Sequence, residues 1–351
     1  MKALVMYGKK AGMVEVRDVP KPMVKEDEIL IQVKAAGVCG TDVDFWLGKN
    51  SHLLNPPVIL GHEFCGVIVE VGDKVKEWKP GDRVVSDNTG YVCGKCRFCL
   101  TGKYVLCEKR KGIGYGMDGG FADYVKIPGE ILQRFSGCLM RLPENLSFEE
   151  GAILEPACNA YRAVFQDISI NPGEAVVIFG PGPIGLFCLQ MAKIGGASKV
   201  IIIGTQGDET RLSLAQKLGA TTINAAKEKV IERVIEVNNG EKVDIVIDAA
   251  GPPIVMKQAL EIIRKEGHIV KIGWSADPLN ISLDSLIANS ITRKGNWGYD
   301  YISWKNVLNL VRENKIDFNS IITDILPLSK WKEAFMKIRD KESVKIVLKP
   351  D

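Results

Sequence analysis

The sequence IFGPGPIG at residues 178–185 decides the fold through the apolar runs that flank it. The run Ala175–Phe179 leads into it and is typical of a buried parallel strand. The stretch Leu186–Ile194 suits a helix packed on a sheet, and a second apolar run follows at Val200–Ile203. In that setting the glycines let a dinucleotide pyrophosphate approach the backbone, and the helix N-terminus offers it free N–H groups. We therefore predict a dinucleotide-binding strand–turn–helix–strand unit rather than a plain packing turn.

The end of the second predicted strand bears on the type of nicotinamide cofactor. An NAD-specific unit usually has Asp or Glu there, to bind the ribose hydroxyls. This chain has Gly204, Thr205 and Gln206 instead, so a 2′-phosphate meets no carboxylate and NADP(H) is favoured over NAD(H). Arg211 is the candidate partner of that phosphate, although it is equally typical of a solvated helix, and Asp208 offers an alternative that serves NAD. The predicted cofactor-binding residues are Gly180, Gly182, Pro183, Ile184, Gly185, Gly204, Thr205 and Arg211.

Apolar strands alternate with helical stretches from about residue 150 to residue 297. The predicted strands are Ala175–Phe179, Val200–Ile203, Val243–Ile247, His268–Ile272 and Ile291–Trp297. This alternation predicts an α/β fold with a doubly wound parallel sheet. The first 150 residues look β-rich, with strand-like runs at Ile29–Val33 and Cys65–Val71. The last stretch carries a predicted helix near Lys330–Lys341 and a final strand, Val344–Leu348, which we expect to return to the first domain. We place one domain at residues 1–152, completed by 298–351, and the dinucleotide-binding domain at 153–297.

Length and composition limit the classes of function. The 351 residues include 46 Lys and Arg against 43 Asp and Glu, for a formal net charge of +3, and 46 % are hydrophobic. The chain is long enough for two cores, and its basic residues form no stripe that would suit nucleic acid or an anionic membrane. The apolar opening stretch is too short for a secretory signal, and no run reaches the length of a membrane-spanning helix. We expect a soluble, cytoplasmic protein.

Four of the nine cysteines crowd into a short stretch, as Cys93, Cys96, Cys99 and Cys107. Four thiolates complete a tetrahedral shell around Zn²⁺ and leave no open position for a substrate. Free thiols or disulfides are the alternative interpretation, but the spacing and the expected compartment favour metal. We predict a structural zinc site here.

A second group of possible zinc ligands is scattered along the chain. Cys39, His62 and Glu155 supply one thiolate, one imidazole and one carboxylate, a set that leaves a coordination position open for water or substrate. On spacing alone the pattern is weak, since a cysteine is often a small core residue and His62 suits a buried structural histidine as well.

Taken together, the motifs resemble the zinc-dependent medium-chain dehydrogenase/reductase family of alcohol and polyol dehydrogenases. The resemblance covers nearly the whole chain. It rests on GVCGTD at residues 37–42, GHE at 61–63, GDRV at 81–84, the four cysteines, GGFADY at 119–124, LEP at 154–156 and the glycine turn. It implies a GroES-like β-rich catalytic domain beside a Rossmann domain, with the active site in the cleft between them.

The resemblance also assigns roles to residues. Cys39 and His62 match catalytic zinc ligands, and Glu155 matches a position where sorbitol, xylitol and threonine dehydrogenases bind zinc directly or through water. Glu63 matches a nearby acid that approaches the metal, and Thr41 matches the hydroxyl that begins a proton relay. The next relay member in many relatives is a histidine, where this chain has Asp44. The implied cofactors are two Zn²⁺ ions per chain, one catalytic and one structural, together with NAD(P)(H).

The reaction implied is hydride transfer between a secondary alcohol, a polyol or sugar, and NAD(P)⁺. L-Threonine 3-dehydrogenase is the enzymatic alternative, and a non-catalytic binding or structural member of the fold is an alternative of another class. The resemblance further suggests a homo-oligomer, a tetramer or a dimer, and places Trp46 and Trp297 near the substrate. An insertion at residues 128–141 either borders the cleft, forms a surface loop or makes a subunit contact.

Overall fold

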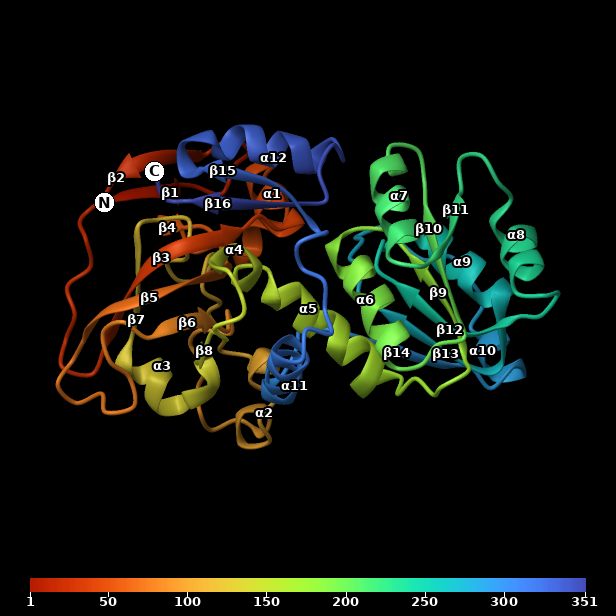
Figure 1. The fold of residues 1–351 in the computed structure, drawn as a ribbon, viewed down its shortest axis with the longest axis horizontal. Helices are drawn as coiled ribbons and strands as arrows, with labels where there is room; N and C mark the ends of the chain where they lie inside the picture. Colours follow the sequence, from red (N-terminus) through yellow and green to blue (C-terminus); the bar gives the residue numbers. More distant parts are fainter. The chain divides into compact units, whose positions relative to one another are not determined.

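The computed structural model describes residues 1–351, except for the side chain of Ser136. Its backbone divides into two compact units (Figure 1). The first unit comprises Met1–Glu155, Asp300–Asn314 and Ile322–Asp351, and the second comprises Pro156–Tyr299 and Lys315–Ile321.

Two β-sheets form the framework of the first unit. One has three antiparallel strands in the order β2-β1-β4, and the other has seven, in the order β15-β16-β3-β5-β6-β8 with β7 also paired to β3. The final strand, β16, pairs antiparallel with β3, so the end of the chain joins the sheet of the first residues. The strands are β1 (Lys2–Met6), β2 (Val14–Asp18), β3 (Ile29–Gly37), β4 (Val58–Ile59), β5 (Glu63–Val71), β6 (Arg83–Ser86), β7 (Tyr124–Ile127), β8 (Leu139–Arg141), β15 (Ile322–Pro327) and β16 (Lys345–Lys349).

Short helices connect these strands, and α12 lies over β15 and β16 (Figure 1). They are α1 (Gly40–Trp46), η1 (Ser51–Leu53), α2 (Arg97–Leu100), η2 (Tyr104–Leu106), α3 (Gly129–Arg134), η3 (Ser136–Cys138), α4 (Phe148–Gly151), α11 (Tyr301–Arg312), η5 (Leu328–Lys330) and α12 (Trp331–Arg339). The helix α5 (Leu154–Tyr161) carries the boundary between the units.

The insertion at residues 128–141 folds as α3, η3 and β8, and it contributes to the core of the first unit. Ile131, Phe135 and Leu139 are buried in that core, and β8 pairs with β6. Phe135 also packs on Tyr104, with ring centroids 4.4 Å apart. Its apolar side chains therefore serve to pack this unit, in contrast to a loop lying wholly on the surface.

The second unit contains a six-stranded sheet in which every strand pairing is parallel. The strand order is β11-β10-β9-β12-β13-β14, so the chain reverses direction across the sheet between β9 and β12. Ligands of doubly wound sheets bind at such a switch point, beyond the carboxyl ends of the strands. The strands are β9 (Ala175–Phe179), β10 (Lys199–Gly204), β11 (Thr221–Asn224), β12 (Val243–Asp248), β13 (Ile263–Lys271) and β14 (Thr292–Gly295).

Both faces of this sheet are covered by helices, as a doubly wound fold requires. Val177 and Phe179 of β9 share one core with side chains of α8 and α9, while α6 packs against β9 and β10. The helical segments are the π-helix η4 (Arg162–Asp167), α6 (Pro183–Ile194), α7 (Glu209–Lys217), α8 (Val230–Val237), α9 (Pro253–Ile262) and α10 (Asp284–Ala288). The predicted α/β fold with a parallel Rossmann sheet is confirmed.

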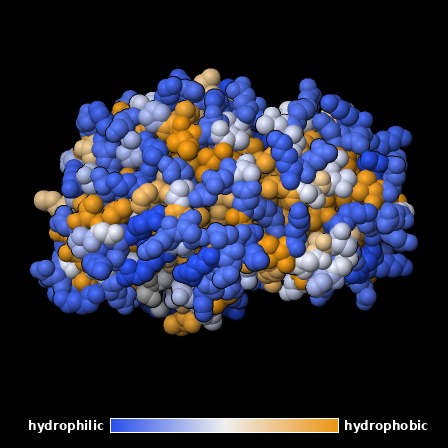
Figure 2. Space-filling model, viewed as in Figure 1, coloured by the Kyte–Doolittle hydropathy of each residue, from blue (hydrophilic) through white to orange (hydrophobic). Residues whose placement is uncertain are grey.

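Hydrophilic residues cover most of the face drawn in Figure 2, with smaller hydrophobic areas between them. Cys65, Cys138, Cys158 and Cys188 are buried, as expected for small core residues. None of the helices in the described residues combines the length and the apolar character needed to cross a membrane.

Candidate active site

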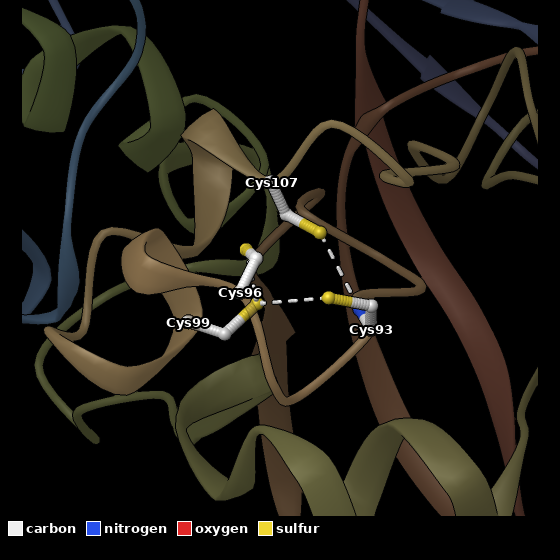
Figure 3. Close-up of side chains that lie close together, drawn as sticks. All are labelled: Cys93, Cys96, Cys99 and Cys107. Carbon is white, nitrogen blue, oxygen red and sulfur yellow. Dashed lines mark hydrogen bonds between the residues drawn. The ribbon is translucent and has the colours of Figure 1, made fainter.

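Four cysteines come together in one small loop region, which we call the four-cysteine lobe (residues 93–107, Figure 3). Cys96 is the N-cap of α2 and Cys99 lies within this helix, while Cys93 precedes them and Cys107 follows η2. The sulfur of Cys99 lies 3.5 Å from that of Cys96 and 4.0 Å from that of Cys93. Zinc–sulfur bonds of about 2.3 Å in a tetrahedron separate the sulfurs by about 3.8 Å, so the spacing fits a closed Zn²⁺ site.

The thiols of the four-cysteine lobe differ in acidity. Backbone N–H groups of Lys95 and Cys96 stabilise the Cys93 thiolate and lower its pKa to about 6. Burial, followed by the hydrogen bond with Cys96, raises the pKa of Cys99 to about 12. A metal ligand must be a thiolate, so metal binding at the lobe displaces protons mainly from thiols such as Cys99.

A second cluster, which we call the Cys39 centre, consists of Cys39, His62 and Glu63. One ligand atom from each of these residues lies within 4.8 Å of the others. The sheet explains why residues this far apart in sequence meet. Gly37, at the end of β3, pairs with Glu63, at the start of the antiparallel strand β5. The residues that follow β3 and those that precede β5 therefore lie at the same end of the sheet. A Cβ on Gly37 would lie 2.6 Å from the Glu63 carboxylate, so only glycine fits there.

Asp42 lies behind His62 and Cys39. Its Oδ2 accepts a hydrogen bond from the backbone N–H of Cys39 at 2.9 Å, and its Oδ1 lies 3.4 Å from Nδ1 of His62. Asp42 is fully buried. Burial lowers the pKa of His62, but the charges of Asp42 and then of Cys39 outweigh it and raise this pKa well above 6.5. A carboxylate behind a metal-binding histidine orients the imidazole and increases its basicity.

Lys345 lies behind Glu63, at the first position of β16. Its Nζ donates a hydrogen bond to Oε1 of Glu63 at 2.8 Å and another to the carbonyl of Val38 at 2.9 Å. Both side chains of the ion pair are almost fully buried. Burial lowers the pKa of Lys345, but Glu63 and then Cys39 raise it further than burial lowers it. This lysine therefore supplies the buried counter-charge of the Glu63 carboxylate.

The donor set of the Cys39 centre fits zinc. A thiolate, an imidazole and a carboxylate are all zinc ligands, and three protein ligands leave a position open. Glu155, at the start of α5, is not among the atoms that converge within 4.8 Å in the described residues. Its Oε1 instead accepts a hydrogen bond from Nδ2 of Asn88 at 3.2 Å. Its negative charge still contributes to the raised pKa of Lys345.

The residues predicted to relay a proton both lie on α1. Thr41 is half-buried in the first turn, two residues after Cys39. Asp44 lies near the other end, where its carboxylate is 3.6 Å from Nζ of Lys49 and accepts a hydrogen bond from Asn50. Trp46, expected near the substrate, packs edge-on against Trp331 of α12, with ring centroids 6.3 Å apart.

The backbone of the glycine turn in the second unit forms the strand–turn–helix connection that the sequence predicts. Gly180, directly after β9, has φ +96°, and Gly182 is the N-cap of α6, with Pro183 in its first turn. A Cβ on Gly185 would lie 1.9 Å from the carbonyl oxygen of Gly180, whereas one on Gly182 would have open space. The helix N-terminus and the open space beside Gly182 suit a pyrophosphate.

The turn after β10 is closed by Asp208. Its Oδ2 accepts a hydrogen bond from the N–H of Thr205 at 3.0 Å, and its Oδ1 lies 3.6 Å from the guanidinium of Arg211. The Arg211 side chain is only 12 % exposed, and burial lowers its pKa despite Asp208. Arg211 therefore packs beside the turn that begins at Gly204, in contrast to a solvated helix residue.

A cavity of about 350 Å³ lies where β13 and β14 end in the second unit. Lys271 and Arg293 line it together with Trp274 and Trp297, whose ring centroids are 5.1 Å apart. Nζ of Lys271 lies 2.7 Å from the carboxylate of the fully buried Asp248. Trp297, which the resemblance places near the substrate, thus lines a cavity, whereas Trp46 is part of an aromatic cluster.

The partners of the predicted ligands were not among the residues predicted from the sequence. Lys345 was detectable, because a lysine within the apolar run Val344–Leu348 needs a buried counter-charge. Asn88 gave no signal, because it belongs to no recognised motif and its contact with Glu155 spans 67 residues. Asp42 is part of the motif after Cys39, but its position behind His62 depends on tertiary structure.

Two family models match the chain. The model described as an alcohol dehydrogenase GroES-like domain matches residues 25–136, and the model described as a zinc-binding dehydrogenase matches residues 183–313.

Several curated proteins are similar over nearly their whole length. The zinc-type alcohol dehydrogenase-like protein YdjL of Escherichia coli K12 is 38 % identical and covers 100 % of this chain and 99 % of its own. D-Arabitol-phosphate dehydrogenase of Enterococcus avium is 37 % identical over 94 % of this chain and 92 % of its own. Sorbitol dehydrogenase of Halalkalibacterium halodurans is 35 % identical over 100 % and 99 %, and L-threonine 3-dehydrogenase of Bacillus subtilis 168 is 34 % identical over the same shares.

Solved structures share the fold over nearly the whole chain. Alcohol dehydrogenase TADH from Thermus sp. ATN1 superimposes with a TM-score of 0.89 at 30 % identity and covers 100 % of both chains. A zinc-binding dehydrogenase from Sinorhizobium meliloti 1021, solved bound to NADP, has a TM-score of 0.89 at 29 % identity over 99 % of both chains. The chain therefore belongs to the zinc-type alcohol dehydrogenases, built from a GroES-like and a zinc-binding dehydrogenase domain, and is an oxidoreductase of that family.

Proposed function

We propose that this oxidoreductase transfers a hydride between a secondary hydroxyl of a polyol or sugar and NADP⁺, with Zn²⁺ at the Cys39 centre. The convergence of Cys39, His62 and Glu63 carries the proposal, because the three ligand atoms lie within 4.8 Å of one another. The named relatives that act on sorbitol and on D-arabitol phosphate support the substrate class.

In this proposal Cys39, His62 and Glu63 hold the metal, and Glu155 serves it directly or through water. When bound, the metal supplies Lewis acidity that lowers the pKa of an adjacent alcohol, and the nicotinamide supplies a hydride acceptor. Asp42 orients His62 through the 3.4 Å contact at Nδ1, and Lys345 holds the Glu63 carboxylate in place through their buried ion pair. The four-cysteine lobe binds a second, structural Zn²⁺.

Thr41 is the proposed first acceptor of the substrate's hydroxyl proton. It lies in the same helical turn as Asp42 and two residues after Cys39, which supports a place beside the metal. Asp44 is the proposed next acceptor, and its carboxylate contacts Lys49 and Asn50. We expect Thr41→Val to lower kcat by about 10²-fold or more while zinc content stays unchanged, as measured by steady-state kinetics and metal analysis. Unchanged kcat would remove Thr41 from the proton path.

The cofactor is proposed to bind along the turn from Gly180 to Gly185 and the turn from Gly204 to Arg211. The second turn carries no carboxylate at Gly204, Thr205 or Gln206, and Arg211 is packed beside it, which supports NADP(H). Arg211→Gln is expected to lower kcat/KM for NADP⁺ about tenfold and to change kcat/KM for NAD⁺ by less than about twofold. A higher kcat/KM for NAD⁺ than for NADP⁺ in the unchanged chain would reject the NADP proposal.

A substrate panel tests the reaction itself. Sorbitol, xylitol, galactitol, inositol, D-arabitol phosphate and L-threonine are each offered with NAD⁺ and NADP⁺, and reduced nicotinamide is followed by absorbance. We expect the largest kcat/KM for a polyol or its phosphate. L-Threonine is the second candidate, favoured by the similarity to L-threonine 3-dehydrogenase, and a larger value for it would replace the polyol proposal. No turnover of any of these alcohols would count against the substrate class as a whole.

Assembly and location are proposals of the same kind. We expect a homo-oligomer, a tetramer or a dimer, in the cytoplasm. Light scattering on the purified chain, together with fractionation of the source cells, checks both expectations, and a monomer would contradict the first.

A further inference from the structure

Arg110 joins the four-cysteine lobe to the surroundings of Glu155. It comes three residues after Cys107, and its backbone N–H donates a hydrogen bond to the carbonyl of Cys107 at 3.0 Å. The backbone position from which its side chain extends is therefore fixed by the end of the lobe. From there the guanidinium reaches the loop that follows β6.

The guanidinium of Arg110 makes three hydrogen bonds to two neighbouring residues. Nε donates to the carbonyl of Thr89 at 3.0 Å, and Nη2 donates to Oδ1 of Asn88 at 2.9 Å and to its backbone carbonyl at 3.3 Å. Asn88 and Thr89 are 4 % and 1 % exposed. Because these acceptors are buried, removal of the guanidinium costs free energy that hydrogen bonds to water cannot offset.

These contacts determine which way the Asn88 amide faces. A guanidinium can only donate, so the amide oxygen of Asn88 must face Arg110. The amide nitrogen is then turned to Glu155, where it donates to Oε1 at 3.2 Å. With the amide reversed, its oxygen would face the carboxylate and its NH₂ would face the guanidinium, and both contacts would be repulsive.

Contacts of Asn88 and Arg110 also extend toward the Cys39 centre. The backbone N–H of Ile113 donates to the carbonyl of Asn88 at 3.0 Å, which ties the segment after the lobe to the loop after β6. Arg110 also lies over the ring of Tyr115 at 5.6 Å, and that ring stands edge-on to His62 at 6.1 Å between centroids. The charge of Glu155, in turn, acts on Lys345, the partner of Glu63.

We propose that Arg110 is a positioning residue that acts through Asn88 on Glu155, so that the four-cysteine lobe fixes the direction of this carboxylate for the metal of the Cys39 centre. The inference rests on the proposed function, in which Glu155 serves the metal. Arg110 touches neither the metal ligands nor a reacting atom in this arrangement. Its effect is on metal affinity, since partners behind metal ligands typically contribute about 10–100-fold.

The test compares Arg110→Met with Lys111→Met. Lys111 is the exposed neighbouring residue, and its Nζ lies 5.8 Å from the Tyr91 ring centroid, so its loss removes the same charge from the same segment. Zinc affinity at the Cys39 centre is measured by chelator competition on the full chain, and the absorption of the Co²⁺-substituted protein reports the ligand geometry. We expect Arg110→Met to weaken zinc binding there about tenfold or more and to shift the Co²⁺ spectrum. Lys111→Met is expected to match the unchanged chain.

Arg110→Lys serves as the second variant, because it keeps the charge and fits the same space. It cannot bond Thr89 and Asn88 through a fork, so we expect a zinc affinity between those of the unchanged chain and Arg110→Met. Affinities of Arg110→Met and Arg110→Lys within about twofold of Lys111→Met would overturn the inference and leave the proposed function standing. If the unchanged chain binds no zinc outside the four cysteines, the proposed function fails first, and the inference fails with it.

Discussion

The four-cysteine lobe and the Cys39 centre use different kinds of surroundings to hold their ligands. In the lobe the ligands contact one another and backbone N–H groups, with sulfurs 3.5 Å and 4.0 Å apart. At the Cys39 centre each ligand other than the thiolate has a charged side chain behind it, Asp42 behind His62 and Lys345 behind Glu63. The lobe needs only a short loop, whereas the centre depends on the pairing of β3, β5 and β16.

This difference fits different roles for the two regions. A closed shell of four sulfurs stabilises a loop but offers a substrate no open position. Mixed ligands with charged partners leave a position open and allow the protein to adjust the basicity of each ligand. The predictions that follow separate the two regions by their effect on catalysis, beginning with the largest.

Removal of the thiolate from the Cys39 centre is expected to have the largest effect. Cys39→Ala should lower kcat/KM by about 10³-fold or more, because Lewis acidity worth several kcal/mol is lost. Metal analysis should find the lobe zinc retained. Cys188→Ala, a buried thiol on α6, is the control and should keep full activity. Equal activity of the two variants would contradict a catalytic Cys39 centre.

The ion pair behind Glu63 is expected to matter for stability as well as catalysis. Lys345→Met leaves a buried carboxylate without its cation and should lower the free energy of unfolding by about 3–5 kcal/mol in the metal-free chain. The control is Lys349→Met in the same strand. Lys349 pairs with Glu149 at 2.7 Å, but its side chain is 47 % exposed, so its loss should cost less than about 1 kcal/mol. Urea titrations measure both, and similar losses would show that burial of Lys345 has no special role.

Asp42→Asn tests the partner of His62 through pH. In the metal-free chain the His62 pKa is raised above 6.5, because Asp42 and Cys39 outweigh burial. The stabilisation from protonated His62 is therefore fully present below pH 6.5 and is lost as the pH rises through the raised pKa. A metal competes with this proton, so zinc affinity should increase over the same pH interval.

Loss of the Asp42 charge should move that increase to lower pH. At high pH, where the proton no longer competes, Asp42→Asn should bind zinc about 10–100-fold more weakly than the unchanged chain. Chelator competition at a series of pH values measures both effects. An unshifted pH dependence would mean that Asp42 does not control His62.

The smallest effect on catalysis is expected from the four-cysteine lobe. Cys107→Ala should remove the lobe zinc and make the loop at residues 93–107 sensitive to proteolysis. With zinc supplied in excess, kcat should fall by no more than about tenfold, because the lobe acts on the Cys39 centre indirectly, through Arg110 and its contacts with Asn88 and Tyr115. A loss as large as that of Cys39→Ala would remove the distinction between the two regions.

The sequence predicted the lobe better than the Cys39 centre, and the reason is distance along the chain. Cys93, Cys96, Cys99 and Cys107 lie within one loop, so their spacing alone indicates a tetrahedral site. Cys39 and His62 meet only because β3 pairs with β5, and their assignment as ligands depended on resemblance to a family. Lys345 comes to Glu63 from 282 residues away, a contact that no local pattern contains.

The fold shows the same dependence on local pattern. The strand Ala175–Phe179 is apolar throughout, and its predicted bounds agree with β9. The strand β11 was missed, because Thr221–Asn224 is short and mostly polar at the sheet edge. The predicted strand at His268 begins earlier in the structure, at Ile263, because β13 continues directly from α9 across charged residues that carry no strand pattern.

Removal of zinc from the intact chain tests the central claim most directly. Zinc per chain, hydride transfer and the thermal midpoint are followed together during dialysis against a mild chelator. We predict two zinc ions per chain at the outset, and a complete loss of activity when the first leaves, while the thermal midpoint stays nearly unchanged. Full activity in a chain that keeps zinc only at the four cysteines would contradict the account.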